Sequence, residues 1–490
     1  GSWPAAPRPL GRGVSMLLRR FYDPKLAQAS YLIGCPASGE ALVVDPNRDL
    51  DPYLQAANEE GLRIAHVTET HIHADFVSGA RELAHRAGAR LYLSDAGGSE
   101  WSYQYAVESK AVLVRDGSEF KVGAVEIRVL HVPGHTPEHL AFLVTDTATA
   151  SEPMGALTGD FIFVGDVGRP DLLERAAQAK GTMEAGARQL FRSLQRCRAL
   201  PDYLQIWPGH GAGSACGKAL GAVPQSTLGY EKRFNWAFGI ADETAFVSAV
   251  LEGQPDPPRY FAEMKRINRA GPRLLGGIRR PARLPVATLA AALAQGATVV
   301  DIRPAVEFAH GAVPGTLNIP GGRTFTTWAG WLLPYDRDFY LIVDDRRGQT
   351  IDQLVRDLAG IGLDQIAGYF GSEVVDAWRA SQGQLQTIPS LSLTDFAAEL
   401  QSNDKVVVDV RGEGEWKAGH LPGSLHLPLG ELDSRLDELP RDRAVIVHCQ
   451  TGARAAMAAS LLRARGFREV SQFPGGFAEW QAAGHPAESS

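Results

Sequence analysis

Residues 70–79 read THIHADFVSG, and this stretch places three potential metal ligands, His71, His73 and Asp75, at alternate positions. In a two-metal hydrolase the same pattern continues with a histidine directly after the aspartate, and that histidine serves the second ion. Phe76 occupies this position here. Because a phenyl ring has no lone pair to donate, the second metal position has lost a ligand. The stretch therefore predicts a single metal ion with open coordination positions.

Three later motifs contain further potential ligands. They are His135 in VPGHTPEHL, Asp160 in LTGDFIFVGDVGRPDLL and His210 in WPGHGAG. Two imidazoles and one carboxylate are the ligand set of non-haem Fe(II) sites that bind O2 and substrate. The spacing does not distinguish His71 from His73 as the first imidazole of this set. Because the second metal position is incomplete, we expect Asp75 and His210 beside the ligands or in the substrate pocket.

Taken together, these motifs resemble a known family. THIHAD, PGHTPEH, TGDFIFVGDVGRPDLL and WPGHGAGSACGK closely resemble the motifs of persulfide dioxygenases of the metallo-β-lactamase superfamily, in the bacterial form that is fused to rhodanese domains. The resemblance extends from about Met16 to the C-terminus. It implies one Fe(II) ion per chain, held by His71, His135 and Asp160. It also implies that His73 lies near the metal without binding it.

Composition indicates the cellular compartment of the protein and restricts the classes of macromolecule that it binds. A net charge of -7 provides no basic surface for nucleic acid. The four cysteines, at positions 35, 197, 216 and 449, are too few and too scattered for a disulfide framework, so we expect the reducing cytoplasm. No apolar run approaches the roughly 20 residues of a membrane span. Residues 1–15 lack the apolar core of a signal peptide, and we interpret them as a leader or an appended segment.

The remaining sequence suggests three domains. In residues 16–278, short apolar strands such as YLIG and RLYLS alternate with helical stretches such as GARELAHRAG, which predicts an α/β protein with an αββα sandwich. RAGPRLLGGIRRPARLP has the composition of a linker. After it, TVVDIRPAVEFAHGAVPGTLNIP from Thr298 and VVVDVRGEGEWKAGHLPGSLHLP from Val406 form an internal repeat. The repeat predicts two rhodanese-like α/β domains with parallel sheets, at residues 283–384 and 390–488.

The second repeat contains a candidate nucleophile. VIVHCQTGARAAMAASLL places Cys449 directly after a buried strand, and the residues from Cys449 to Arg454 lead into a helix. Backbone N–H groups of such a loop, the helix N-terminus and the Arg454 guanidinium all favour an anionic sulfur. A six-residue loop fits a sulfur atom, whereas phosphatase relatives of this fold have a longer loop for phosphate. We therefore expect Cys449 and Arg454 to be catalytic in sulfur transfer.

The first repeat lacks this nucleophile. Its aligned stretch, LIVDDRRGQTIDQLV, has Asp345 at the position of Cys449 and Thr350 at the position of Arg454. A persulfide cannot form there because no thiol is present. We expect the middle domain to serve as a scaffold, an oligomerisation surface or a docking wall, and the chain to form a homo-oligomer.

Two residues near the expected metal site have alternative interpretations. Cys216 follows His210 by six positions. It either takes part in a sulfur relay at the active site or is a small buried residue that only fills the core. Arg169 either contacts the anionic part of a thiol substrate or forms an internal ion pair with Asp166 or Asp171. Neither choice follows from the sequence alone.

These features combine into one functional prediction. The resemblance implies that a low-molecular-weight thiol persulfide is oxidised with O2 to sulfite, and that Cys449 then forms or uses thiosulfate. One alternative is a zinc thioester hydrolase of the glyoxalase II type fused to a sulfur-carrier rhodanese, against which Phe76 argues. Another is a non-catalytic sulfur carrier or scaffold, against which the complete set of His71, His135 and Asp160 argues. Oxygen uptake distinguishes the prediction from both alternatives.

Overall fold

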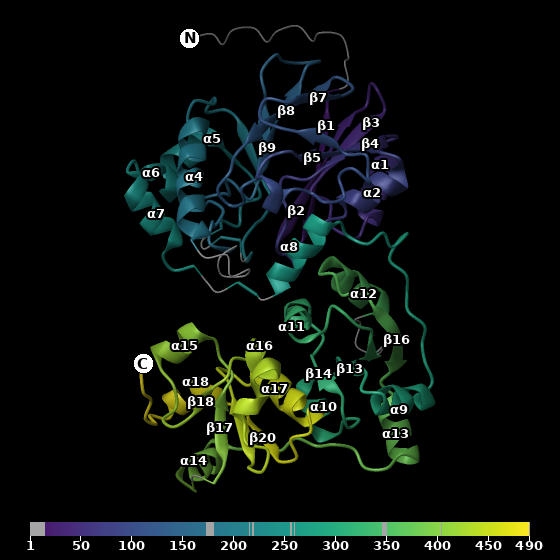
Figure 1. The fold of residues 1–490 in the computed structure, drawn as a ribbon, viewed down its shortest axis with the longest axis vertical. Coiled ribbons are helices and arrows are strands. Elements are labelled where there is room, and N and C mark those ends of the chain that lie inside the picture. Colours follow the sequence, from purple (N-terminus) through teal and green to yellow (C-terminus); the bar gives the residue numbers. More distant parts are fainter. Residues whose placement is uncertain are drawn as a thin grey trace, which may run out of the picture. The chain divides into compact units, whose positions relative to one another are not determined.

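The computed structural model describes residues 15–172, 181–214, 216–217, 220–254, 257–258, 260–344, 350–402 and 404–489. The chain forms two compact units, Gly1–Ile278 with Ala359–Gly362 and Arg279–Leu358 with Leu363–Ser490. Figure 1 shows the first unit mainly from purple to teal and the second mainly from green to yellow. Each unit has hydrophobic cores of its own, as expected of separate domains.

Two six-stranded sheets form the centre of the first unit. One has the order β1-β2-β3-β4-β5-β6 and the other the order β12-β11-β10-β9-β8-β7. The first contains β1 Leu17–Asp23, β2 Gln28–Cys35, β3 Glu40–Val44, β4 Arg63–Thr68, β5 Arg90–Ser94 and β6 Val112–Val114. The second contains β7 Glu119–Val122, β8 Val125–His131, β9 Leu140–Asp146, β10 Gly155–Gly159, β11 Gln205–Pro208 and β12 Ser226–Thr227. Because the two sheets pack face to face, β2, β3 and β9 are buried along almost their whole length.

Helices cover both outer faces of this pair of sheets. α1 Asp51–Glu59 and α2 Ala80–Ala87 pack on the first sheet, and α4 Thr182–Cys197 and α7 Glu243–Leu251 pack on the second. α5 Leu228–Phe234, α6 Trp236–Gly239 and α8 Tyr260–Ala270 also belong to this unit. Figure 1 shows the helix, sheet, sheet, helix order of the layers. The αββα sandwich predicted from the strand pattern is confirmed.

Loops at one edge of the sandwich carry the candidate ligands. β3, β4 and β5 run parallel, and so do β10 and β11, so their carboxyl ends lie together at the same edge of each sheet. Asp45 directly follows β3, and Asp160 directly follows β10. The Leu140 N–H donates to the Thr70 carbonyl at 2.7 Å, which links β9 of one sheet to the loop after β4 of the other. The site therefore forms where loops of both sheets meet.

The second unit contains two parallel sheets of identical strand order, β14-β13-β15-β16 and β18-β17-β19-β20. The strands are β13 Thr298–Asp301, β14 Leu317–Asn318, β15 Phe339–Val343, β16 Ile366–Gly371, β17 Val406–Asp409, β18 Leu425–His426, β19 Val445–His448 and β20 Val470–Phe473. The helices are α9 Val286–Ala294, α10 Ala305–His310, α11 Phe325–Leu332, α12 Ile351–Gly360, α13 Val374–Ser381, α14 Leu393–Ser402, α15 Glu413–Ala418, α16 Leu429–Leu432, α17 Ala453–Ala464 and α18 Gly476–Ala482. The prediction of two parallel α/β domains from the internal repeat is confirmed. Across the described residues of both units, every helix is too short or too polar to cross a membrane.

Each of these two domains has the same buried ion pair at the end of its first strand. Arg303 binds Asp301 through Nε and Nη2, at 3.0 and 2.7 Å from Oδ2. Arg411 binds Asp409 with the same two nitrogens, also at 3.0 and 2.7 Å. In both domains the same Nη2 also donates to a backbone carbonyl eight residues further on. The repeat therefore preserves a polar contact as well as the apolar pattern.

We expect Arg411→Met to destabilise the C-terminal domain by about 3–5 kcal/mol, because it leaves the buried Asp409 carboxylate without its partner. Arg465→Met is the matched control, because Arg465 and Asp433 form an ion pair with side chains 41% and 45% exposed, and such pairs contribute about 0–1 kcal/mol. Calorimetry of the full chain measures both as shifts of the thermal transition. Equal shifts for the two variants would contradict a structural role for the buried pair.

Candidate active sites

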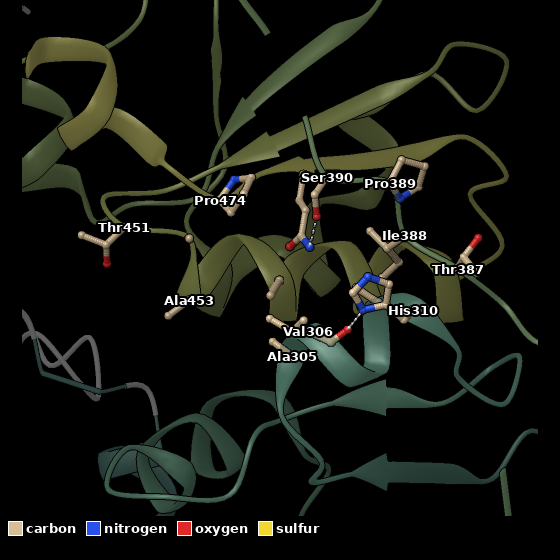
Figure 2. Close-up of a pocket in the computed structure, with 14 residues that line it drawn as sticks. Ala305, Val306, His310, Thr387, Ile388, Pro389, Ser390, Thr451, Ala453 and Pro474 are labelled. Atoms are coloured by element: carbon tan, nitrogen blue, oxygen red, sulfur yellow. Dashed lines mark hydrogen bonds between the residues drawn. The ribbon is translucent and has the colours of Figure 1, made fainter. Parts of the chain in front are cut away.

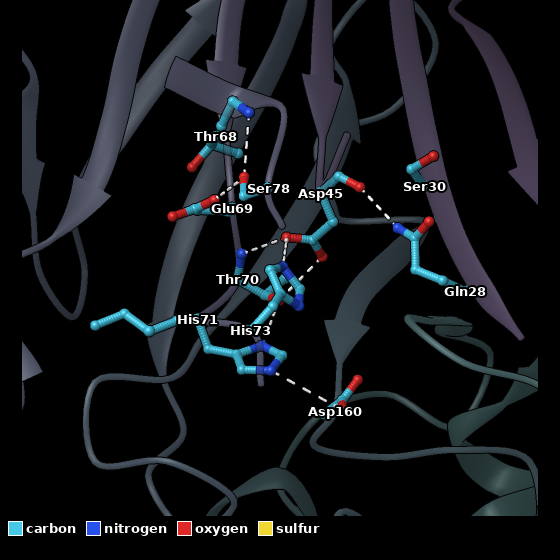
Figure 3. Close-up of polar contacts among 12 residues, drawn as sticks. Gln28, Ser30, Asp45, Thr68, Glu69, Thr70, His71, His73, Ser78 and Asp160 are labelled. Carbon is cyan, nitrogen blue, oxygen red and sulfur yellow. Dashed lines mark hydrogen bonds and ion pairs between the residues drawn. The ribbon is translucent and has the colours of Figure 1, made fainter. Parts of the chain in front are cut away.

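The first candidate site is a buried group of His71, His135 and Asp160, called here the histidine–aspartate group. Its ligand atoms all lie within 4.8 Å of one another. Asp160 Oδ2 is 3.5 Å from His135 Nε2 and 3.9 Å from His71 Nε2, and Figure 3 shows the His71 contact. Ligand atoms about 2.1 Å from a shared ion lie roughly 3–3.5 Å apart, so the group is close to the size that a metal requires. Both Asp160 carboxylate oxygens are buried without a hydrogen-bond partner in the described part of the chain, which fits a cation.

Hydrogen bonds aim the two imidazoles at this centre. Thr70 Oγ1 donates to Asp45 Oδ2 at 3.0 Å, so it is left to accept from His71 Nδ1 at 2.9 Å. His135 Nδ1 donates to the Arg169 carbonyl at 2.9 Å. Each ring therefore carries its proton on Nδ1 and presents the lone pair of Nε2 to Asp160. This arrangement is typical of metal sites, in which outer hydrogen bonds fix the ligand tautomer.

His73 lies beside this group, with its ring centroid 4.2 Å from that of His71, but its Nε2 is bound by Asp45. Its Nε2 lies 3.0 Å from Asp45 Oδ1, as Figure 3 shows. Burial by itself lowers the pKa of His73, but the charge and hydrogen bond of Asp45 outweigh burial and raise that pKa to about 9. The spacing left His71 and His73 as alternatives, and the structure gathers His71 with the other two residues.

Two residues of this site were missed in the sequence. His139 is fully buried, its ring stacks on His71 at 4.6 Å, and its Nε2 accepts the Asp160 N–H at 3.0 Å. Burial, followed by the charge of His135, lowers the pKa of His139 well below its usual range, which keeps the ring neutral as an acceptor. Asp45 was the other omission. The available signals were the second histidine of PGHTPEH and the aspartate that ends ALVVD.

A second cluster lies beside the first. Asp75, His210 and Cys216 are buried, and their ligand atoms also lie within 4.8 Å of one another; we call them the sulfur-containing group. His210 Nε2 is 3.2 Å from Asp75 Oδ2 and 3.4 Å from Asp160 Oδ1. Burial, then Asp160, raises the pKa of Asp75, and burial, then the two carboxylates, raises that of the Cys216 thiol well above its usual range. The expectation of a single metal ion, made because Phe76 stands in the place of a second-site histidine, stays a prediction, and this second cluster has three potential ligands among the described residues, one of them Cys216.

Arg169 supports the first site through its backbone. Its side chain is fully buried and binds Asp171 through Nε and Nη2 at 2.8 and 2.7 Å. This geometry corresponds to the internal ion pair rather than to a substrate contact. The Arg169 carbonyl in turn accepts from the His135 ring. Its contribution to the site is therefore to orient the His135 imidazole.

The second candidate site is the loop between β19 and α17. Cys449 directly follows β19, is 1% exposed, and its Sγ accepts the Gly452 N–H at 3.1 Å. Gly452 has φ 91°, and a Cβ there would lie 2.3 Å from the Pro474 carbonyl oxygen, so only glycine fits. Arg454 donates to both carboxylate oxygens of Glu415, at 2.6 and 2.8 Å. The corresponding Asp345 of the middle domain lies outside the described residues.

A pocket of about 710 Å³ adjoins this loop. Figure 2 shows that α10 of the middle domain and α17 of the C-terminal domain provide opposite walls. Val306 and His310 line it from α10, and Thr451 and Ala453 line it from the loop and α17. The middle domain therefore contributes directly to the surroundings of the Cys449 loop, although it lacks a thiol at the aligned position.

Comparisons with known proteins agree with both parts of the fold. The model of the metallo-beta-lactamase superfamily matches residues 23–210, and that of the rhodanese-like domain matches residues 392–483. A metallo-beta-lactamase from Staphylococcus aureus subsp. aureus COL, known from its crystal structure, is 45% identical, with 73% of this chain and 99% of that chain covered and a TM-score of 0.66.

Two curated relatives bear on the chemistry. Persulfide dioxygenase ETHE1 of Bos taurus is 28% identical over 207 residues, which are 41% of this chain and 70% of the relative. The hydroxyacylglutathione hydrolase of Methylococcus capsulatus is 34% identical over 180 residues, which are 37% of this chain and 60% of the relative. For this hydrolase and two other curated relatives, the chain spans less than two thirds of the relative's length.

The chain thus combines potential metal ligands at the edge of an αββα sandwich with a cysteine loop on a parallel sheet, which is the class of a metal-binding enzyme that carries a rhodanese-like domain. The chain belongs to the metallo-β-lactamase superfamily and carries a C-terminal rhodanese-like domain. The predicted fusion of a domain that has persulfide dioxygenase homologues with a rhodanese domain is thereby confirmed.

His139→Phe tests whether His139 positions the metal ligands. A phenyl ring retains the stacking on His71 but cannot accept the Asp160 N–H, so we expect metal affinity to fall about 10–100-fold, as it does when hydrogen-bond partners of metal ligands are removed. Competition with a chelator under anaerobic conditions measures this affinity. His131→Phe is the control, because His131 contacts the Pro137 carbonyl and is separate from both groups. Unchanged affinity in His139→Phe would show that the hydrogen bond is dispensable.

Proposed function

We propose that the chain is a non-haem iron persulfide dioxygenase coupled to a rhodanese sulfurtransferase. The observation that carries this proposal is the buried histidine–aspartate group, with two Nε2 lone pairs and an unpartnered carboxylate facing one centre. An Fe(II) ion bound there would keep positions open for a persulfide sulfur and for O2, and would transfer electrons between them. The persulfide dioxygenase relatives support the same assignment.

The proposal assigns one task to each domain. Residues 16–278 bind the metal and the persulfide, residues 283–384 are an inactive rhodanese homology domain, and residues 390–488 transfer sulfur. The four cysteines are free thiols, which fits the reducing cytoplasm. The pocket beside the Cys449 loop supports a role for the middle domain as a docking wall.

The first reaction converts a thiol persulfide, O2 and water into the free thiol, sulfite and two protons. The chain must exclude bulk water from this reaction. The three residues of the histidine–aspartate group meet this requirement, because they are at most 2% exposed. Thr70 and Asp45 keep the proton of His71 on Nδ1, so that Nε2 stays free for the metal. The ligand geometry is therefore set before substrate arrives, which is the condition for fast chemistry at such a site.

The second reaction takes place at Cys449. The Cys449 thiolate attacks the outer sulfur of a second thiol persulfide, the S–S bond of that donor breaks, and the free thiol leaves, so that Cys449 carries a persulfide. Sulfite then attacks the outer sulfur of this persulfide, its S–S bond breaks, and thiosulfate leaves while the electron pair returns to the Cys449 sulfur. The Gly452 N–H at 3.1 Å supports the resulting negative charge on Sγ. Fusion raises the effective concentration of sulfite at this loop. The reverse reaction, which uses thiosulfate to form a persulfide, employs the same groups.

A zinc thioester hydrolase is the second candidate function. The 34% identity to a hydroxyacylglutathione hydrolase favours it. Hydrolysis of a thioester requires no oxygen, so activity under nitrogen distinguishes the two candidates. Oxygen uptake on addition of a thiol persulfide, together with iron in the purified protein, supports the dioxygenase. Thioester cleavage without oxygen uptake would replace it with the hydrolase.

Two variants test whether the sites act independently. We expect His71→Ala to abolish oxygen uptake, because the metal loses one of three ligands, and to leave sulfur transfer from thiosulfate to cyanide at the level of the unmodified protein. Cys449→Ser should show the reverse pattern. An oxygen electrode and a thiocyanate assay provide the two measurements. Loss of both activities in a folded single variant would contradict independent sites.

Cys449→Ser also tests the order of the two reactions. If sulfur transfer follows oxidation, we expect oxygen uptake with persulfide to remain within about 2-fold while sulfite accumulates in place of thiosulfate, because a hydroxyl cannot carry sulfane sulfur. Ion chromatography of the products measures the ratio. Asp345→Ala, at the aligned position of the middle domain, is the control and should change neither product. Undiminished thiosulfate in Cys449→Ser, after correction for the uncatalysed reaction, would place its formation elsewhere.

A further inference from the structure

The charge around Cys449 depends on side chains outside its loop. Arg454, the second residue of α17, donates through Nη1 and Nη2 to the two carboxylate oxygens of Glu415, at 2.6 and 2.8 Å. A contact through two nitrogens fixes the plane of a guanidinium group and is stronger than a contact through one. Glu415 belongs to α15, an element separate from the loop. The arginine that is expected to favour an anionic sulfur therefore has its charge balanced by a carboxylate.

Glu415 is held in place as an ionised carboxylate. The hydrogen bonds from Arg454 lower the pKa of Glu415 and outweigh partial burial, which raises it. The same carboxylate accepts the Gly412 N–H at 3.2 Å, which caps the first turn of α15. The side chains of Arg454 and Glu415 are 22% and 39% exposed, so water screens the pair only in part. Glu415 therefore provides a fixed negative charge beside the loop.

A second pair of opposite charges contacts the loop. Arg411 binds the buried Asp409 and also donates through Nη1 to Gln450 Oε1 at 3.2 Å, so it reaches the residue directly after Cys449. His448, which directly precedes Cys449, is fully buried, and burial lowers its pKa to about 4, so its ring is neutral at physiological pH. The charged side chains that these contacts place beside the loop thus form two neutral pairs.

Backbone groups remain to favour a negative charge at Cys449. The Gly452 N–H lies 3.1 Å from Sγ, and α17 begins directly after Gly452. Backbone N–H groups and a helix N-terminus carry partial positive charges, which suit a single negative charge such as that of a thiolate or of a persulfide anion. Thiosulfate carries two negative charges. The second of these would require a cation whose charge is not already balanced.

We propose that Glu415 sets the donor specificity of the Cys449 loop: it balances the charge of Arg454, so that the loop favours a singly charged thiol persulfide over the thiosulfate dianion. With either donor, the Cys449 thiolate attacks the outer sulfur, the S–S bond of the donor breaks, and a thiol or sulfite leaves with the electron pair. Weak binding of thiosulfate also eases its departure when it is the product. Glu415 acts through Arg454 and is therefore a positioning residue. This inference rests on the sulfur transfer proposed for Cys449.

Alkylation of Cys449 measures the charge at the loop without any sulfur transfer. Iodoacetate and iodoacetamide both react with a thiolate by displacement of iodide, but only iodoacetate carries a charge. We measure both rates in the full chain by mass spectrometry of the peptide that contains Cys449. We expect Glu415→Gln to raise the ratio of the iodoacetate rate to the iodoacetamide rate at least 3-fold, because the amide keeps the shape of the side chain and removes its charge.

Two further variants separate charge from structure. Glu415→Asp keeps the charge, so its ratio should stay within about 2-fold of that of the unmodified chain. Glu413→Gln is the matched control, because Glu413 lies on the same helix but pairs with Lys417, and it should leave the ratio unchanged. An unchanged ratio in folded Glu415→Gln overturns the proposal. An equal rise in Glu415→Asp or in Glu413→Gln overturns it as well.

Salt gives a measurement that needs no variant, and it decides if Glu415→Gln fails to fold by circular dichroism. A loop with balanced charges should not attract iodoacetate from a distance. Its rate ratio in the unmodified chain should therefore fall less than 2-fold when the salt concentration rises from about 0.02 to 0.5 M. A steeper fall would show that the loop carries a net positive charge, and would overturn the proposal.

Sulfur transfer to cyanide tests the consequence for the donor. We compare thiosulfate with the persulfide of 2-mercaptoethanol, whose only charge is on sulfur, after correction for the uncatalysed reaction. Glu415→Gln should lower KM for thiosulfate at least 3-fold while kcat stays within 2-fold, and KM for the persulfide should change less. Equal changes for both donors would overturn the role in specificity. Absence of transfer from both donors in the unmodified chain would instead contradict the proposed sulfur transfer itself, whereas the alkylation ratios do not depend on it.

Discussion

The carboxylate of Asp160 is the constraint on which the metal region depends. It is buried, has no hydrogen-bond partner in the described part of the chain, and faces the Nε2 atoms of His71, His135 and His210. The cost of burying such a charge is large unless a cation or donors compensate it. The surrounding loops are therefore organised to hold this carboxylate for a metal. A Cβ on Gly168 would lie 1.8 Å from the Asp160 carbonyl oxygen, so the chain at that position must be glycine.

The hydrogen bonds around the histidine–aspartate group hold its side chains in a fixed geometry. Asp45 receives the Thr70 hydroxyl and the His73 ring, and the Thr70 hydroxyl in turn accepts from His71. These bonds satisfy polar groups that burial would otherwise leave unpaired. They also hold the His71 lone pair toward the centre, so that little reorganisation is needed when a metal binds.

The two rhodanese-like domains show how one scaffold serves two purposes. Both have the same strand order and the same buried aspartate–arginine pair. These features stabilise the fold without touching sulfur. The two domains differ in the loop that follows the third strand in the chain, where Cys449 is present in one domain and a carboxylate aligns in the other. The middle domain therefore keeps the architecture while its surface lines a pocket beside its neighbour's loop.

The sequence by itself determined the fold class, the repeat, the candidate ligands and the candidate thiol. Each of these depends on local signals: alternating apolar strands, recurrent motifs, and residue types with known donor atoms. The linker and the two parallel domains followed from the same signals.

Only the tertiary structure decided which donors meet. It separated His71 from His73, because Asp45, distant in the chain, binds the latter. It brought Cys216 to Asp75 and His210, and it paired Arg169 with Asp171. These outcomes depend on how loops of two sheets converge at one edge, and residue spacing carries no information about contacts between loops that are far apart in the chain.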